Sequence, residues 1–291
     1  MTQLEYTKSN GQPAHFEIDS SEKILDFRES DAKYVDLTPL NTCSKLERLF
    51  LAKNQLEILD LSPLSGITSL RWLDLSHNQL KHVDLSQLGE CKNLERISLS
   101  YNPLIQIDLS FLAHCSSLRV LRLTNTALRS IDFRFLRKCS NLEQLSVAFN
   151  ELEAIDLAPL TSCPKLEILS LNRNCVEHLD LSPLSTCMQL KTLNLSDNRL
   201  NQVELYPLST CFNLFSLILS KNQLKDVNLT PIGKLRNLKG LDLSSNQLKV
   251  VDLSPLQDCT KTEIKLYGNP LEEILQPENA CTNLVLEAPS K

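Results

Sequence analysis

The chain has 291 residues, of which 42% are hydrophobic and 22% charged, and its formal net charge is −5. This composition is that of a soluble globular protein, and the negative charge argues against nucleic acid or an acidic membrane as the main partner. No apolar stretch is long enough to predict a transmembrane helix. The first residues, Met1 to Ser9, contain no apolar run, so we predict no signal peptide and a cytoplasmic, intracellular location.

Residues 1–21 carry the signal of a β-hairpin. Asn10 and Gly11 lie between two alternating segments, one containing Leu4 and the other Phe16. Asn-Gly is favoured in two-residue hairpin turns because both residues tolerate a positive φ. We therefore predict that residues 1–21 form an N-terminal cap on the periodic part of the chain.

After this segment the sequence repeats with a period of 24 residues. The marker is asparagine, which recurs at intervals that are multiples of 24: Asn54, Asn78, Asn102, Asn150, Asn174, Asn198, Asn222 and Asn246. Thr126 interrupts the series, and Asn269 comes one residue early. With a degenerate first copy at residues 22–45, about eleven copies fill most of the chain. A fixed period of this length predicts a solenoid of stacked coils.

One copy contains a short strand. In the copy that begins at Leu70, Leu73 and Leu75 alternate with Trp72 and Asp74, which is the period of a strand with one buried face. The equivalent strand of the next copy should lie beside it in parallel, about 4.8 Å away. The asparagine that ends each strand is expected to be buried and to satisfy backbone groups of its own coil and the next.

The return segment of several copies begins with Ser or Thr before Pro. These pairs are Thr38-Pro39, Ser62-Pro63, Ser182-Pro183, Thr230-Pro231 and Ser254-Pro255. An N-cap residue followed by Pro at the first helical position predicts a single 3₁₀ or α turn in each copy.

The repeated phrase, L-x-x-L-x-L-x-x-N-x-L-x-x-h-D-L-S-P-L-x-x-C-x-x, resembles the leucine-rich repeat of the 24-residue typical variety over about nine-tenths of the chain. The resemblance implies an α/β fold: a right-handed solenoid, or horseshoe, with a concave parallel β-sheet and short 3₁₀ or α turns on its convex side. We place this solenoid at residues 22–284 and a C-terminal tail at residues 285–291. The resemblance also implies a non-catalytic scaffold that binds a protein or peptide.

Eight of the ten cysteines take the same position of the repeat: Cys43, Cys91, Cys115, Cys139, Cys163, Cys187, Cys211 and Cys259. Ile67 and Leu235 take this position in other copies, so we interpret the row as small buried hydrophobes with free thiols in a reducing compartment. Cys281 is expected to join the row, whereas Cys175 lies at a turn. Disulfides or a metal site are the alternatives.

A row of aspartates precedes the return segments: Asp60, Asp84, Asp108, Asp132, Asp156, Asp180 and Asp252. We expect each carboxylate to accept hydrogen bonds from the backbone amide and hydroxyl two residues on. The alternative is a row of cation sites. Glu204 and Asn228 replace the aspartate in two copies, which favours the first interpretation.

No catalytic motif is present. The six glycines form no phosphate-binding loop, and the five histidines fall at different positions of the repeat. We therefore predict no enzymatic activity, no cofactor and no metal site.

The outward positions of the concave sheet are not fixed by the repeat, so the residues there can indicate function. Aromatic and arginine side chains, the types enriched at binding hot spots, gather there in the N-terminal and middle copies. The predicted partner-binding residues are Arg48, Phe50, Trp72, His77, Arg96, Tyr101, Arg122, Phe149 and Arg173. An acidic segment with an apolar anchor is the expected partner of a monomeric chain.

The alternative function is that of a structural or regulatory subunit that contacts a larger assembly through its convex face or its ends. Phe111 and Phe135 replace the proline of neighbouring copies on the convex side. They would form an exposed patch there, but we favour the interpretation that both rings fold onto the coil.

Overall fold

The structure of the chain is a computed structural model, and it describes residues 2–276 and 283–287. The chain divides into two units, residues 1–150 and residues 151–291, and each unit is a stack of coils. Each coil contributes a short strand to a parallel sheet, and in residues 24–265 the middle residue of this strand is a buried aliphatic because the side chains alternate between the core and the surface.

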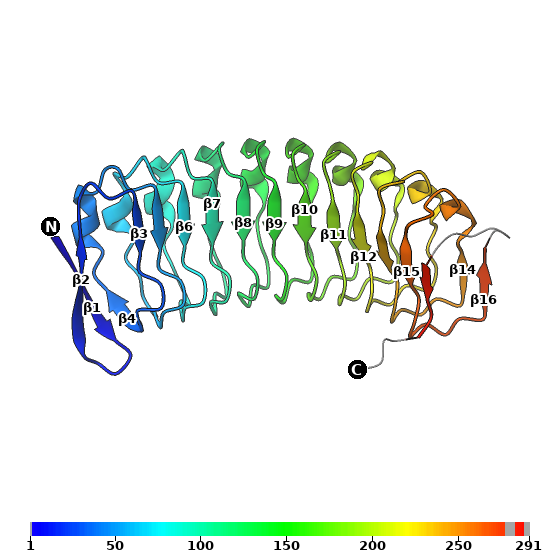
Figure 1. Cartoon of the computed structure of the whole chain (residues 1–291), viewed down its shortest axis with the longest axis horizontal. Coiled ribbons are helices and arrows are strands. Elements are labelled where there is room, and N and C mark those ends of the chain that lie inside the picture. The colour runs from blue at the N-terminus through cyan, green and yellow to red at the C-terminus, as the bar shows by residue number, and fades with distance from the viewer. Residues whose placement is uncertain (1, 277–282, 288–291) are drawn as a thin grey trace. The chain divides into compact units, whose positions relative to one another are not determined.

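In the first unit six such strands form a parallel sheet in chain order (Figure 1). They are β3 (Ile24–Asp26), β5 (Arg48–Phe50), β6 (Trp72–Asp74), β7 (Arg96–Ser98), β8 (Val120–Arg122) and β9 (Gln144–Ser146). Each residue pairs with the residue at the same repeat position in the next strand, as Leu49 does with Leu73. This register keeps all the aliphatic side chains on the core face.

The second unit has the same organisation. Its parallel sheet contains β10 (Ile168–Ser170), β11 (Thr192–Asn194), β12 (Ser216–Ile218), β13 (Gly240–Asp242), β15 (Glu263–Lys265) and β17 (Asn283–Val285). A two-stranded sheet pairs β14 (Val250–Asp252) with β16 (Glu273–Leu275). Cys281 and residues 288–291 of the predicted tail lie outside the described residues.

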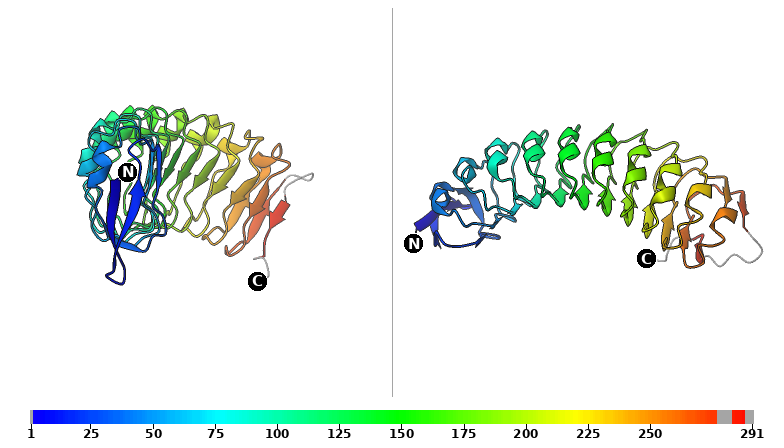
Figure 2. Two further views of the ribbon diagram at one scale, coloured as in Figure 1. Left: turned by 60° about the vertical axis from the view of Figure 1, so that its left-hand side comes forward. Right: turned by 90° about the horizontal axis from the view of Figure 1, so that it is seen from above.

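The return segments are 3₁₀ turns, as the sequence predicts, on the opposite side of each unit from its sheet (Figure 2). They are η1 (Thr38–Thr42), η2 (Ser62–Leu64), η3 (Ser86–Glu90), η4 (Ser110–His114), η5 (Arg134–Lys138), η6 (Ala158–Ser162), η7 (Ser182–Thr186), η8 (Tyr206–Thr210), η9 (Thr230–Ile232) and η10 (Ser254–Leu256).

The prediction that Ser or Thr is the N-cap of these turns is wrong. In η2 the N-cap is Leu61, which makes no side-chain capping bond, and Ser62 is the first residue of the turn. The amide of Ser62 donates instead to Oδ1 of Asp60, 2.8 Å away. The acceptor of the amide at the start of the turn is therefore the aspartate and not a Ser or Thr hydroxyl, because the aspartate side chain reaches the amide two residues on.

The predicted amide hydrogen bonds of the aspartate row are confirmed. The predicted hydroxyl hydrogen bond is present at Asp60 and Asp180, but it is absent at Asp132 and Asp156, where the residue two positions on carries no hydroxyl. All seven carboxylates accept the backbone amide two residues on, as Asp180 does from Ser182 at 2.8 Å. Hydrogen bonds from the Ser182 side chain and backbone lower the pKa of Asp180. Glu204 and Asn228 accept equivalent amides, which explains why they can replace Asp.

The asparagines form the predicted ladder, but each one bridges its own coil and the preceding coil rather than the next. Asn102 donates through Nδ2 to the carbonyls of Leu99 in its own coil and Leu75 in the coil before, both at 2.9 Å. Its Oδ1 accepts the amide of Leu80 at 3.1 Å. Each asparagine bridges to the preceding coil because the turn of that coil lies beside the end of the strand that the asparagine follows.

Thr126 breaks the ladder, and Asn150 compensates for it. Oδ1 of Asn150 accepts two amides, those of Thr126 and Leu128, both at 3.0 Å. It also lies 2.9 Å from the Thr126 hydroxyl. Asn150 therefore satisfies one backbone donor more than Asn102 does.

The residue before each ladder asparagine adopts a left-handed conformation. Its φ lies between 54° and 58° in every copy from Lys53 to Ser245. Where Ser30 or Thr126 replaces the asparagine, the following residue, Asp31 or Ala127, also has a positive φ. This conformation is unfavourable for residues other than Gly, Asn and Asp, so the ladder holds the backbone in a conformation that it does not prefer.

The predicted hairpin is present. β1 (Thr2–Lys8) pairs antiparallel with β2 (Pro13–Ile18), and β1 also pairs with β4 (Ala32–Val35) of the first coil, a contact that the sequence does not predict. The ring of Phe27 is fully buried against Tyr6 and Phe16, at centroid distances of 4.9 and 5.6 Å. The hairpin therefore covers the open end of the first coil, which a solenoid needs to hide its apolar edge.

The eight cysteines of the shared repeat position are buried, as expected of small hydrophobes. Six of their thiols lie near carbonyl oxygens of the preceding coil, as Cys187 Sγ does at 3.6 Å from the Cys163 oxygen. Burial raises the pKa of Cys91, Cys187 and Cys211 from 9.0 to about 11. It raises the pKa of Cys115 and Cys139 to about 12. Cys175, outside the row, is only partly buried.

The first prediction compares two ladder positions. Asn102→Ala should lower the free energy of unfolding by about 3 kcal/mol, because it leaves buried backbone groups without partners. Asn150→Ala should cost about 1 kcal/mol more, because two amides lose their acceptor instead of one. Urea titration measures both values, and Asn41→Ala in the exposed turn η1 is the control. Equal losses for Asn102→Ala and Asn150→Ala would contradict the account of the Thr126 break.

The second prediction concerns the thiols. Near pH 8, iodoacetamide should modify Cys175 before any of the eight buried ladder cysteines in the native protein, because burial and raised pKa values leave the ladder thiols in the protonated, unreactive form. In denaturant all ten cysteines should react without prior reduction. Peptide mass spectrometry gives both results. A native disulfide between ladder positions would overturn the interpretation of the row as free thiols.

The third prediction concerns the cap. Deletion of residues 1–21 should expose Phe27 and the neighbouring core, so that the melting temperature falls and the protein aggregates. Calorimetry and light scattering measure these effects. Deletion of residues 2–5 alone is a graded control that removes only part of β1. A fully truncated chain that stays monomeric with an unchanged melting temperature would show that the hairpin is no cap.

Candidate protein-binding surface

The outward residues of the first unit's sheet are aligned by the strand register. Arg48 pairs with Trp72, and Trp72 pairs with Arg96, so three consecutive copies present these side chains in one row. The first and third residues of each three-residue strand point away from the buried aliphatic in the middle. The row therefore follows from the period of the sequence.

Four side chains from neighbouring copies form a stack of cations and aromatic rings. Arg28 lies over the ring of Phe50, 5.0 Å from its centroid. Phe50 meets Trp72 edge to face at 4.9 Å, with an interplanar angle of 87°. Arg96 lies over the Trp72 ring at 5.2 Å. We call Arg28, Phe50, Trp72 and Arg96 the aromatic stack. Cations over aromatic faces and edge-to-face rings are both attractive arrangements.

Phe50 differs from its predicted role. Its side chain is only 8% exposed, because Arg28 and Trp72 cover it. It supports Trp72 and is not itself a surface that a partner can contact widely. Trp72 remains partly exposed, and Arg48 is exposed.

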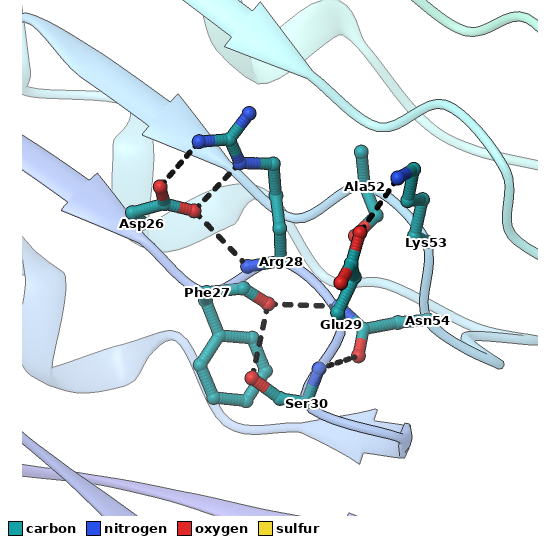
Figure 3. Close-up of polar contacts among 8 residues, drawn as sticks. All are labelled: Asp26, Phe27, Arg28, Glu29, Ser30, Ala52, Lys53 and Asn54. Atoms are coloured by element: carbon teal, nitrogen blue, oxygen red, sulfur yellow. Dashed lines mark hydrogen bonds and ion pairs between the residues drawn. The ribbon is translucent and has the colours of Figure 1, made fainter.

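Sequence reasoning missed Arg28. It occupies a position of the degenerate first copy where later copies carry small residues such as Ala52 and Ser76. This large cation among small residues is the sequence signal that could have identified Arg28. Asp26 holds the guanidinium, with Nε 2.8 Å from Oδ1 (Figure 3). The same contact lowers the pKa of Asp26. Nearby, Lys53 and Glu29 form an ion pair at 2.6 Å (Figure 3).

His77 and Tyr101 form a second group. They take the left-handed position before the ladder asparagine in adjacent copies, and their rings stack at 4.1 Å with an interplanar angle of 10°. Tyr101 is 44% exposed. His77 lies in the copy of Trp72 and Tyr101 in the copy of Arg96, so both groups belong to the same two coils, with His77 and Tyr101 in the bends that follow strands β6 and β7.

The remaining candidates are less closely connected. Arg122 follows Arg96 by one strand and donates to Gln144 Oε1 at 3.1 Å. Phe149 is 40% exposed two copies after Tyr101. Arg173 belongs to the second unit, where it pairs with Asp197 at 3.1 Å. The structure thus brings together the candidates from Arg48 to Tyr101, with Arg122 at their border.

The alternative patch on the side of the 3₁₀ turns is wrong. Phe111 is 7% exposed and Phe135 is 6% exposed, because both rings fold onto their coils as we favoured. Arg134 beside them is exposed and pairs with Asp132 at 2.6 Å.

Among residues 2–276 and 283–287, no three or more His, Cys, Asp or Glu side chains gather in a way that would hold a metal ion. Over the same residues, each helix is too short or too polar to span a bilayer.

Comparison with known families agrees with the geometry. Two family models described as leucine rich repeat match the chain, one at residues 24–80, 68–128 and 140–200 and the other at residues 237–259. These matches cover more than half of the sequence, and the chain belongs to the leucine-rich repeat family. No curated protein matches it.

Solved structures show the same fold. The functional domain of InlJ from Listeria monocytogenes, which includes a cysteine ladder, is similar with a TM-score of 0.69 and 23% identity, over 90% of this chain and 54% of that one. The plant peptide hormone receptor RGFR1 in complex with RGF2 has a TM-score of 0.64 and 21% identity, over 85% and 48%. The TLR13–ssRNA13 complex has a TM-score of 0.66 and 27% identity, over 88% of this chain and 36% of that one. The present chain therefore spans about half or less of these proteins.

Proposed function

We propose that the chain is a binding scaffold that holds a protein or peptide on the sheet face of its first unit. Leucine-rich repeat proteins commonly mediate protein–protein or ligand binding and are typically non-catalytic. The observation that carries the proposal is the aromatic stack, in which Trp72 is partly exposed between Arg96 and the buried Phe50.

The aromatic stack is ordered before a ligand arrives. Contacts with Phe50 and Arg96 restrict the Trp72 ring, and the ion pair with Asp26 restricts Arg28. A partner that binds to restricted side chains loses less conformational entropy than one that must order them. Tryptophan, tyrosine and arginine in such surroundings are the usual hot-spot residues.

The charges favour an acidic ligand. Arg48 and Arg96 flank Trp72 in the strand register. The neighbouring carboxylate of Asp74 accepts the Ser76 hydroxyl at 2.6 Å and the Ser76 amide at 3.0 Å. A ligand carboxylate beside an apolar or aromatic side chain would therefore complement this surface.

A protein ligand is favoured over RNA. TLR13 is in complex with an RNA and RGFR1 with RGF2, so similar folds take both kinds of ligand. The net charge of −5 of the present chain opposes a phosphate backbone, whereas a short acidic peptide needs only a local group of cations. We further infer an intracellular location, which rests on the row of buried cysteines, and no catalytic activity.

The fourth prediction tests the sheet face. Peptides selected from a displayed random library on the immobilised chain should be rich in acidic and aromatic residues. Trp72→Ala should weaken the selected peptides by about 2 kcal/mol, or about 30-fold, as measured by calorimetry. The melting temperature should change little, because the indole lies outside the aliphatic core.

The control for this experiment is Ile105→Ala, which removes an exposed apolar side chain elsewhere in the first unit. It should leave the affinity unchanged. If Trp72→Ala and Arg96→Ala bind the peptides as tightly as the wild-type chain does, the aromatic stack is not the binding site.

A further inference from the structure

Three large apolar side chains are exposed on two consecutive coils of the second unit. Met188 is 57% exposed, Phe212 is 59% exposed and Phe215 is 55% exposed. Met188 and Phe212 each follow the ladder cysteine of their copy, and Phe215 directly precedes strand β12. We call these three residues the edge patch, since they lie where the chain enters the strands.

The fold does not need apolar residues at these positions. Other copies carry Ser116 and Ser140 after the ladder cysteine. Before the strand, the first unit carries charges that alternate in sign from copy to copy and form ion pairs, as Arg71 does with Glu95 at 2.6 Å. The coils thus form equally well with polar side chains there, and exposed apolar groups that folding does not require indicate an interaction surface.

Backbone contacts place Phe212 beside Met188 of the preceding coil, and Phe215 beside Lys191, three residues further along both coils. Asn213, the neighbour of Phe212, donates to the Met188 carbonyl at 3.1 Å. The amide of Phe215 donates to the carbonyl of Lys191 at 2.8 Å. Since Met188 and Phe212 occupy the same position in stacked coils, their backbones are separated by about the strand spacing of 4.8 Å.

Cations border the edge patch. Lys191 and Lys239 stand before the strands on either side of the Phe215 strand, and Arg236 follows Phe212 at the next copy's equivalent position. Lys191 pairs with Glu167 at 2.9 Å and Arg236 with Asp258 at 3.5 Å. These pairs are exposed, so they exchange partners at little cost.

We propose that the edge patch binds a protein segment that carries apolar side chains and carboxylates, at a second surface that the sheet-face site does not use. The apolar side chains would cover the two phenylalanines and Met188, and the carboxylates would meet the bordering cations. A second copy of the chain fits less well, because a two-fold contact would bring Lys239 and Arg236 against like charges.

The fifth prediction tests this surface with a fluorescein-labelled peptide, Glu-Asp-Phe-Glu-Leu-Phe-Asp-Glu. Fluorescence anisotropy should show binding to the Trp72→Ala chain, in which the sheet-face site is weakened. Adding the triple variant Met188→Ser, Phe212→Ser, Phe215→Glu to that chain should weaken the binding by about tenfold or more. The variant should fold, since each new residue stands at the same position in another copy, as Ser116, Ser140 and Glu143 do. Circular dichroism and the melting temperature check this.

Two further arms separate the possible results. Trp72→Ala should leave binding of the peptide to the edge patch unchanged. If Trp72→Ala abolishes binding and the triple variant does not, the peptide binds the sheet face, and this result overturns the present proposal but not the proposed function. A peptide with Lys in place of Glu and Asp should bind much more weakly. No binding of the acidic peptide, equal binding of the lysine peptide, or a dimer in sedimentation that the triple variant abolishes would each overturn the proposal.

Discussion

The hydrogen bonds of the buried asparagines are the constraint on which the rest of this structure depends. Each side chain joins the end of its own strand to the turn of the preceding coil, as Asn102 does with Leu99 and Leu75. A coil cannot leave its neighbour without exposing these buried groups, which is costly in an apolar interior. The ladder therefore fixes both the stacking of the coils and the register of the strands.

The ladder also shapes the candidate site. By holding the residue before each asparagine in the left-handed conformation, it places His77 and Tyr101 at equivalent points of adjacent coils, where their rings stack. The strand register does the same for Trp72 and Arg96. Side chains far apart in sequence thus become one ordered surface, and the strain at the left-handed positions is compatible with folding because the ladder offsets it.

The two surfaces differ in how the rest of the fold treats them. On the sheet face an aromatic residue, Phe50, is partly absorbed into the structure and supports Trp72. At the edge patch the apolar side chains support no neighbour that the coils require, since Ser or a charged residue takes the same places elsewhere. The sheet face is pre-organised for binding, whereas the edge patch consists of apolar residues at repeat positions that are polar in other copies.

The sequence alone determined the repeat, the strands, the 3₁₀ turns, the terminal hairpin and the burial of the cysteines, because a fixed period with alternating leucines admits one way of burying them. It also placed Arg48, Trp72 and Arg96 in one row. Only the tertiary structure decided that Arg28 completes the aromatic stack, that Phe50 is covered, that β1 pairs with β4 and that each ladder asparagine bridges to the preceding coil. These features depend on contacts between side chains and backbone of different coils, or on local geometry at atomic scale, which the repeat period does not specify.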